Sequence, residues 1–213
     1  MYNPPHFAVD DAAPLQALIQ QHPLGMLVLQ TEGQLDAHHL PFWLRVDAQG
    51  QTYLQAHVAR ANPLWQQLSG GGPVLVVFRA EQAYVSPNWY PSKHEQHRLV
   101  PTWNYRVVHA HGQLTVHDDE KFLRAVVGRL TQHHEALVQQ QSPQAYPAWK
   151  MADAAPDALQ QMLGAIVGLE IAVSRLEGKF KISQNRLPQD RLAVADQLQV
   201  TGQTALAQHM RDA

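Results

Sequence analysis

The stretch Tyr84–Tyr105 gathers, within one connection of the chain, the kinds of side chain that bind a flat ligand. Its rings are those of Tyr84, Trp89, Tyr90, Trp103 and Tyr105, and serine, threonine, asparagine and lysine donors stand between them. A connection that only reverses the chain is short and rich in glycine, asparagine and aspartate, whereas long ordered loops are usually functional. Stacking faces with a few fixed donors suit a planar ligand. The residues equally permit a proline-stiffened loop whose rings cover the edge of the core.

A second candidate site is the segment Ala56–Pro63 (AHVARANP), where Arg60 and Asn62 stand between a predicted strand and a predicted helix. Free amides at the start of a helix, together with a guanidinium, form a site for an anion such as a nucleotide phosphate. The alternative interpretation is a helix that Asn62 caps, beside a solvated arginine.

A third group of donors lies in 179–186 (KFKISQNR), which has a net positive charge and follows the last predicted strand. Its polar members are Lys179, Lys181, Ser183, Gln184, Asn185 and Arg186. This group can complete a phosphate site, also on a neighbouring subunit. Taken locally, an exposed basic turn is the commoner outcome for such a segment.

The pair His109 and His111 places two imidazoles on one face of a predicted strand, which is compatible with a metal site. A third ligand has to come from elsewhere, with His39, His57 and His117 as candidates. Because the chain has 13 histidines, chance explains much of this spacing, and we predict no metal site. No residue stands out as a required acid or base, so His109 and His111 are weak catalytic candidates.

Composition bounds the class of protein. The chain has 213 residues, of which 45% are hydrophobic and 16% charged, so it can bury a core. No apolar run approaches the roughly 20 residues of a membrane span, and a cytoplasmic protein is the default expectation. The absence of cysteine excludes disulfides, thiolate zinc sites and thiol catalysis. A formal net charge of −2 does not support DNA binding.

Hydrophobic periodicity predicts how these residues are positioned. Strands are expected at 24–30, 38–46, 52–58, 74–78, 105–117 and 165–176. Helices are expected at 10–21, from Asn62, at 118–137, from 153–156 to Gly164, and at 188–197 and 204–210. Pro41 indicates an edge or a bulge within its strand.

The short turns between these strands predict antiparallel pairing, and closure of the sheet on itself is expected because closure removes its edges. We therefore predict a mainly β fold with appended helices (α+β), built on a small barrel of six or so strands. No repeat or linker divides the chain. Residues 1–178 are expected to form the barrel domain, and 179–213 a helical appendix packed on the barrel or on a partner subunit.

In their order along the chain, these segments resemble the PaiB family of the FMN-binding split-barrel superfamily. The resemblance lies in Met1–Pro4 (MYNP), His39–Phe42 (HLPF), Ala56–Pro63, 84–93 (YVSPNWYPSK), 100–112 (VPTWNYRVVHAHG) and 179–186. It implies a six-stranded antiparallel split β-barrel that forms a homodimer, with FMN in a groove between the subunits. Family members resemble negative transcriptional regulators.

The resemblance also implies roles for individual residues toward FMN. Arg60 and Lys93 are expected to hold the phosphate, and His57, Asn62 and Ser86 to donate hydrogen bonds. Trp89, Tyr90 and Trp103 are expected to wall the isoalloxazine ring, with Thr102 or Asn104 at its polar edge. Lys179, Ser183 and Gln184 are expected to reach across the dimer.

Four functions remain open at this point. The first is a flavin-binding homodimer that acts as a flavin-dependent oxidoreductase, in which the flavin supplies the redox chemistry. The second is a regulator that senses a small molecule. The third is a haem-binding or haem-degrading split barrel, in which a groove histidine ligates the iron. The fourth is a split barrel whose groove no longer holds a cofactor.

Overall fold

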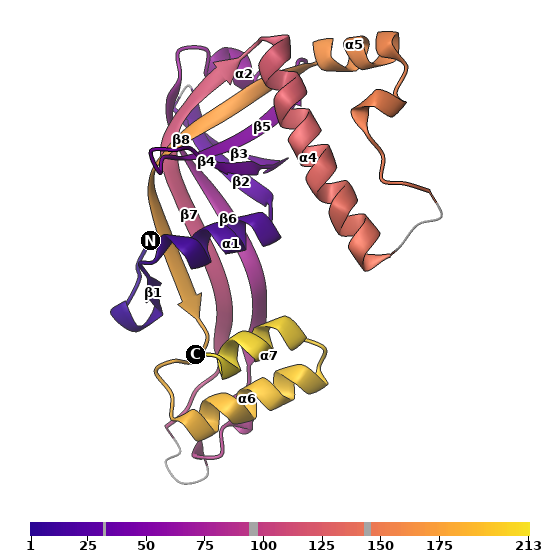
Figure 1. The fold of residues 1–213 in the computed structure, drawn as a ribbon. Coiled ribbons are helices and arrows are strands. Elements are labelled where there is room, and N and C mark those ends of the chain that lie inside the picture. The colour runs from indigo at the N-terminus through magenta and orange to yellow at the C-terminus, as the bar shows by residue number, and fades with distance from the viewer. Residues whose placement is uncertain (32, 94–97, 143–145) are drawn as a thin grey trace. The chain divides into compact units, whose positions relative to one another are not determined.

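The computed structural model describes residues 1–31, 33–93, 98–142 and 146–213, so residues 94–97 of the aromatic stretch lie outside it. The chain divides into two compact units. The first unit comprises Met1–His22, Val77–His109 and Leu176–Ala213, and the second comprises Pro23–Val76 and Ala110–Arg175. Figure 1 traces the elements along the chain.

An eight-stranded sheet has the order β3-β2-β6-β7-β8-β5-β4, and the short β1 pairs with β8. The strands are β1 (Ala8–Val9), β2 (Leu24–Thr31), β3 (Gln34–Pro41), β4 (Trp43–Val46), β5 (Thr52–Ala59), β6 (Gly72–Val85), β7 (Thr102–His117) and β8 (Ile166–Lys181). The ladders β2–β3, β4–β5, β5–β8 and β1–β8 are antiparallel, as predicted. In the described residues no ladder joins β3 to β4, so the sheet is open rather than closed.

The strand count exceeds the predicted six partly because the strand expected at 38–46 is broken. β3 ends at Pro41 and β4 begins at Trp43. Between them Phe42 is 2% exposed, and its backbone N–H donates to the carbonyl of Pro23 at 2.9 Å instead of to a ladder. Pro41 was predicted to mark an edge or a bulge, and here the chain turns into a new strand.

In the second unit, helix α4 (Glu120–Gln141) packs against β4 and β5. Asp119 caps it by accepting from the N–H of Phe122. Its buried residues are Leu123, Val126 and Leu130. The ring of Phe122, by contrast, stacks on His117 with centroids 4.0 Å apart. The second unit also contains α2 (Leu64–Gln67), η3 (Met151–Asp153) and α5 (Pro156–Gly164).

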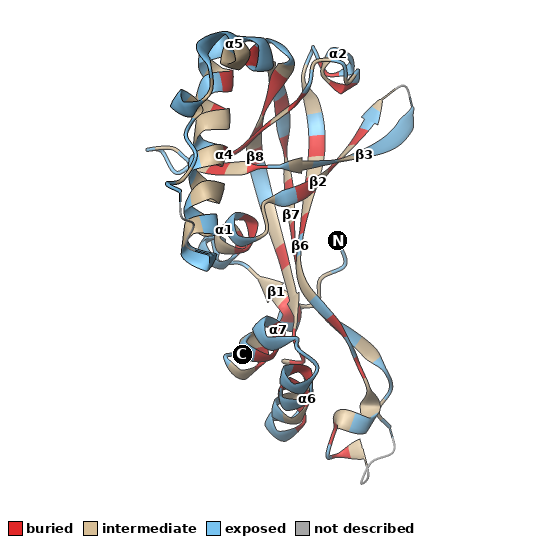
Figure 2. Cartoon of the chain, turned by 90° about the vertical axis from the view of Figure 1, so that its right-hand side faces the viewer, coloured by how far each residue is buried: buried red, intermediate tan, exposed pale blue. Residues whose placement is uncertain are grey.

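In the first unit, α6 (Pro188–Val200) and α7 (Thr204–Arg211) pack on one another around a turn in which Gly202 has φ of +81°. Their inner faces are buried in Figure 2. They form a core cluster with residues from β6, the aromatic stretch and the turn after β8: Ala83, Val85, Tyr90, Ile182, Val194, Ala195, Leu198, Leu206, Ala207 and Met210. Burial of each large apolar side chain stabilises the fold by roughly 1.5–3 kcal/mol.

The N-terminal elements of the first unit are η1 (Pro5–Phe7) and α1 (Ala12–Gln21), and η2 (Pro87–Trp89) lies in the aromatic stretch. Asp11 caps α1 by accepting from the N–H of Ala13 at 3.1 Å. Strand β8 runs five residues beyond its predicted end and includes Gly178. A Cβ atom there would lie 2.1 Å from the side chain of Leu15, so α1 can pack on β8 only where a glycine stands.

None of the helices in the described part of the chain combines the length and the apolar composition that crossing a bilayer requires.

Candidate functional site

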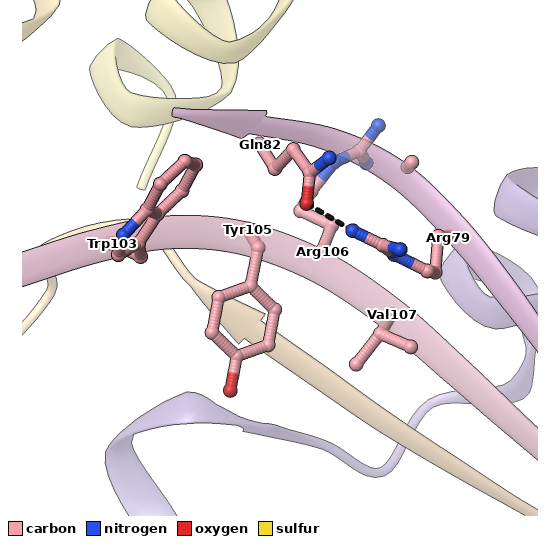
Figure 3. Close-up of a pocket in the computed structure, with 7 residues that line it drawn as sticks. Arg79, Gln82, Trp103, Tyr105, Arg106 and Val107 are labelled. Atoms are coloured by element: carbon pink, nitrogen blue, oxygen red, sulfur yellow. Dashed lines mark hydrogen bonds between the residues drawn. The ribbon is translucent and has the colours of Figure 1, made fainter. Parts of the chain in front are cut away.

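The first unit carries an aromatic–lysine face, which we define as Trp103 and Tyr105 of β7 with Lys179 and Lys181 of β8. Side chains alternate along a strand, so Trp103 and Tyr105 share one face of β7, and Figure 3 shows both projecting from it. Trp103 is 54% exposed, which is unusual for an indole. Tyr84 meets its ring edge-on, with centroids 6.3 Å apart.

The two lysines of this face contact neutral groups. The Nζ of Lys181 donates to the hydroxyl of Thr102 and to the carbonyl of Trp103. The Nζ of Lys179 donates to the carbonyl of Tyr2 at 3.0 Å and lies 5.7 Å from the ring centroid of Tyr105. Within the described residues neither ammonium pairs with a carboxylate, so both positive charges are uncompensated.

The surroundings of Lys181 disfavour its charged form. Burial lowers the pKa of Lys181 below its ordinary value of 10.5, and the positive charges of Lys179 and Arg186 lower this pKa further. A half-buried cation without a counter-charge beside a second cation favours binding of an anion.

A cavity of about 320 Å³ lies beside the rings, between β6 and β7. Its walls include Trp103, Tyr105 and Val107 of β7, and Arg79 and Gln82 of β6 (Figure 3). Arg79 donates to the side chain of Gln82, which fixes the cavity's polar edge. The cavity therefore combines aromatic faces with a cation and an amide.

Other site residues predicted in the first unit are built into its interior. Tyr90 is 1% exposed within the core cluster, and Trp89 packs against that cluster. Asn104, also 1% exposed, donates to Ser183 Oγ at 2.9 Å and to Met210 Sδ at 3.4 Å. The structure thus separates Trp103 from Asn104 by the two faces of β7.

The side chains of Ser86, Lys93 and Gln184 hold local turns. Ser86 Oγ accepts from the N–H of Asn88 at 3.2 Å, and Lys93 donates to the side chain of Asn88. Gln184 accepts from the N–H of Ile182 at 2.9 Å. That turn contains Ser183 with φ of +67°, a left-handed conformation that costs energy in a residue other than glycine.

In the second unit, Arg60 is anchored by protein groups. Its Nη1 donates to Asp118 Oδ2 at 2.9 Å, and its Nη2 also reaches the Asp118 carboxylate. Nε donates to the carbonyl of Gly164 at 2.7 Å, and Nη2 to that of Ile166 at 3.1 Å. The hydrogen bonds from Arg60 hold the pKa of Asp118 below its usual value. This guanidinium is therefore occupied.

Asn62 follows the second interpretation of its segment, because its Oδ1 accepts from the N–H of Leu64 at 3.0 Å at the start of the four-residue α2. His57 lies on β5 opposite Gly168 of β8. Its Nδ1 is buried and has no hydrogen-bond partner among the described residues, and burial lowers the pKa of its imidazole.

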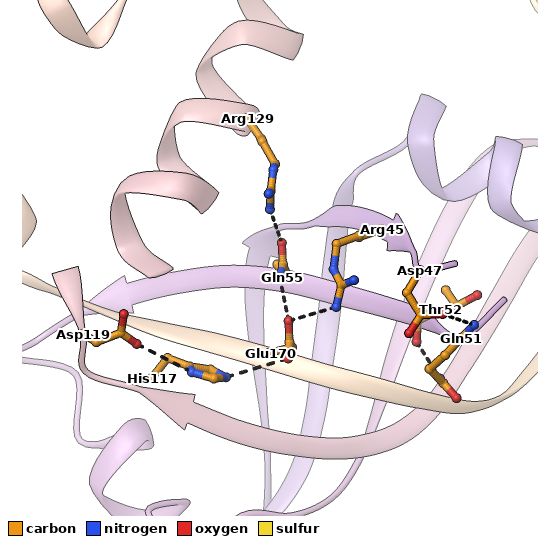
Figure 4. A network of polar contacts seen from close by, with 9 residues as sticks. All are labelled: Arg45, Asp47, Gln51, Thr52, Gln55, His117, Asp119, Arg129 and Glu170. Carbon is orange, nitrogen blue, oxygen red and sulfur yellow. Dashed lines mark hydrogen bonds and ion pairs between the residues drawn. The ribbon is translucent and has the colours of Figure 1, made fainter. Parts of the chain in front are cut away.

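A polar network that sequence reasoning missed surrounds Glu170 of β8 (Figure 4). Glu170 accepts from Gln55 at 2.6 Å and lies 3.7 Å from Arg45 and 3.8 Å from His117. Arg129 of α4 donates to Gln55 at 3.2 Å. The network provides partners for the buried side chain of Gln55 between α4 and the sheet, and we interpret it as structural.

His109 and His111, the weak catalytic candidates, both lie on β7, where His109 belongs to the first unit and His111 to the second. Tyr105, Arg79 and Gln82 were not predicted as site residues. Alternation along β7 was a signal that could have placed Tyr105 beside Trp103.

Comparison with known proteins adds independent information. Residues 1–175 match the sequence model of a family described as "Putative FMN-binding domain". The protease synthase and sporulation protein PAI 2 of Bacillus subtilis (strain 168) is 30% identical over 202 residues, which cover 93% of this chain and 89% of that relative.

Among solved structures, the FAD and heme binding protein of Mycobacterium smegmatis superposes with a TM-score of 0.57 at 19% identity, over 82% of this chain and 73% of the other. A conserved hypothetical protein of Mycobacterium tuberculosis superposes with a TM-score of 0.56 at 14% identity, over 88% of this chain and 94% of the other. At these identities the two structures show a shared fold, which agrees with the predicted split-barrel class.

Proposed function

Since the chain belongs to this family of FMN-binding domains, as the PaiB resemblance predicted, we propose that it holds FMN against the aromatic–lysine face, between two copies of the chain. The observation that carries the proposal is the exposed indole of Trp103 together with two ammonium groups that have no carboxylate partner among the described residues. Lys181 contacts the Thr102 hydroxyl and the Trp103 carbonyl, and Lys179 lies near the ring of Tyr105.

This set of residues fits FMN on chemical grounds. Trp103 and Tyr105 offer faces on which a planar ring system stacks. Lys179 and Lys181 offer charge-assisted hydrogen bonds to an anionic phosphate. When bound, the flavin supplies the redox chemistry, and the chain's own residues orient it and exclude water.

We assign the phosphate to the two lysines rather than to Arg60, because a phosphate at Arg60 would have to displace Asp118 and two backbone carbonyls. The other residues that the resemblance assigns, among them His57, Asn62, Ser86 and Lys93, stay predictions about how the groove is completed.

A homodimer is supported by apolar exposure in the first unit. Tyr2 is 85% exposed, Val100 63% and Tyr84 46%, in addition to Trp103. Exposed apolar groups of this size often mark an interface, and a second copy would cover the open side of a flavin stacked on Trp103. Sedimentation equilibrium with and without FMN tests this, and a monomer under both conditions contradicts it.

The flavin proposal is tested by mass spectrometry of the small molecule released from gently denatured protein, with the absorption spectrum recorded beforehand. We expect the mass of FMN. Titration of flavin-free protein should show FMN binding about tenfold or more tighter than riboflavin, which lacks the phosphate. Failure to bind either flavin contradicts the proposal, and a Soret band on addition of haem supports the haem alternative instead.

A regulatory role is the second candidate, and it rests on the PaiB resemblance, which agrees with the 30% identity to the Bacillus subtilis protein PAI 2. A mobility shift on specific promoter DNA that survives moderate salt would support direct regulation, because non-specific binding is lost with salt. Oxidation of reduced pyridine nucleotide by the FMN-loaded protein would support an oxidoreductase.

A further inference from the structure

A second cavity in the first unit, of about 480 Å³, lies where the turn after β8 meets the aromatic stretch. Its walls include Ser92, Leu99, Asn185, Arg186, Leu187 and Asp190. These residues come from two of the segments that sequence analysis singled out, and the flavin proposal uses none of them. Gln184, which the resemblance assigns to the flavin, also lines this cavity, but its side chain is engaged with the backbone of Phe180 and Ile182.

The acidic residue of this cavity is already engaged. Asp190 is 2% exposed at the start of α6, and its Oδ1 accepts from the N–H of Ser92 at 3.0 Å. Its Oδ2 accepts from the hydroxyl of Ser92 at 2.6 Å. This pair joins α6 to the aromatic stretch and fixes one wall of the cavity.

Arg186, in contrast, has no carboxylate partner among the described residues. Its guanidinium carbon lies 5.3 Å from the ring centroid of Tyr90, which fixes the side chain by a cation–π contact. The positive charge of Arg186 also acts on Lys181, whose pKa it helps to lower. The five N–H donors of a guanidinium match the oxygens of a carboxylate or phosphate.

The remaining walls are apolar or neutral. Leu99 is partly buried and Leu187 is 49% exposed, while the amide of Asn185 is exposed beside Arg186. Small-molecule sites commonly combine apolar walls with a few polar groups that fix orientation. The described lining thus combines a guanidinium without a carboxylate partner, the exposed amide of Asn185 and two leucines, while the second amide, that of Gln184, is engaged with the backbone of Phe180 and Ile182. This combination suits an anionic group on a carbon skeleton.

We propose that this cavity binds a small organic anion, a carboxylate or a phosphate monoester, as a second ligand separate from the flavin. Arg186 pairs with the anionic group, Asn185 donates to it, and Leu99 and Leu187 cover its carbon skeleton. The inference goes beyond flavin binding and does not require it.

The test is calorimetric titration of the full chain, once flavin-free and once with saturating FMN, using benzoate and phenyl phosphate as probes. Benzamide, the neutral isostere of benzoate, is the ligand control. We expect either or both anions to bind in both states, and benzamide to bind in neither. In Arg186→Gln the anion affinity should fall about tenfold or more.

Arg191→Gln is the matched control, since Arg191 lies on α6 outside the cavity lining and should leave anion affinity unchanged. If Arg186→Gln does not fold, Asn185→Asp, at an exposed position, should weaken anion binding by repulsion. The proposal is overturned if the cavity variants bind the anions as tightly as the unmodified protein does. It is also overturned if benzamide binds as tightly as benzoate.

Displacement of the anions by FMN would also overturn the proposal, because it would make this cavity part of the flavin site. Absence of flavin binding leaves the test intact, because one titration uses flavin-free protein.

Discussion

Arg60 of the second unit and Lys181 of the first unit are both basic residues in segments that resemble a flavin-binding family, yet their surroundings differ. Arg60 directs three of its nitrogens to a carboxylate and two carbonyls. Lys181 donates to a hydroxyl and a carbonyl and has no counter-charge among the described residues.

The difference shows that a basic residue in a motif can bind an anionic ligand only if no protein carboxylate already neutralises its charge. A planar guanidinium matches a carboxylate with two parallel hydrogen bonds, which makes Arg60 a structural connector. Neutral oxygens satisfy the donors of an ammonium without neutralising it, and so Lys181 retains a charge for a ligand. This account assigns anion binding to uncompensated cations and structure to compensated ones.

The largest effect is expected for a compensated cation inside the first unit. Arg106 is 5% exposed, and its Nε and Nη2 both donate to Glu81 Oε2, at 2.8 and 2.6 Å. Arg106→Met removes the arginine partner of that carboxylate, leaves only His22 at 3.4 Å beside it among the ion pairs of the described residues, and should lower the free energy of unfolding by about 3–5 kcal/mol. Urea denaturation measures the change. Lys181→Met, the matched control, should destabilise far less, and equal losses would contradict the distinction.

The second effect concerns affinity. Lys181→Met should weaken FMN binding by about 1.5–3 kcal/mol, because a charge-assisted contact to the phosphate is lost. Riboflavin affinity should hardly change, since riboflavin has no phosphate. Isothermal titration with both flavins measures the difference, and an equal loss for both would show that Lys181 acts on the ring or on the fold.

Trp103→Ala is the complementary change. Loss of a stacking face should weaken FMN and riboflavin alike, by about 0.5–1.5 kcal/mol. Quenching of flavin fluorescence by the indole should decrease at the same time. Full quenching in the variant would place the flavin elsewhere.

Much of the fold was predictable, because strand and helix positions follow from local periodicity. The interruption between β3 and β4 was not predictable. There the backbone N–H of Phe42 bonds to the carbonyl of Pro23 instead of to a neighbouring strand, and no local sequence pattern indicates this contact. The sequence also did not indicate which site residues are already paired within the protein, because Asp118, the partner of Arg60, lies 58 positions away along the chain. Predicting residue types for a phosphate site was possible, but predicting which of them were already paired required the fold.

FMN affinity should also depend on pH through Lys181, and this effect should be smaller than those of the substitutions above. The pKa of Lys181 lies below 10.5 in the free protein, chiefly because of burial. A bound phosphate stabilises the charged form, so FMN affinity should be full below the free-protein pKa and fall as pH rises through it. Riboflavin affinity should stay level over the same range. The titration of Lys181→Met with FMN should lose this slope, and its persistence would assign the slope to another group.

The smallest effect on flavin is expected at Arg60. Arg60→Met should leave FMN affinity unchanged and lower the melting temperature, because Asp118 and the carbonyls of Gly164 and Ile166 lose their donor. Differential scanning fluorimetry and FMN titration on the same preparation read both quantities. Weakened FMN binding with an unchanged melting temperature would reverse the roles assigned here.

The most direct test of the account is the ratio of FMN affinity to riboflavin affinity, measured by titration calorimetry in the double variant Lys179→Met/Lys181→Met and in Arg60→Met. The account predicts that the ratio falls toward one in the double variant and keeps the value of the unmodified protein in Arg60→Met. A ratio that survives the loss of both lysines, or that collapses with Arg60 alone, would contradict it.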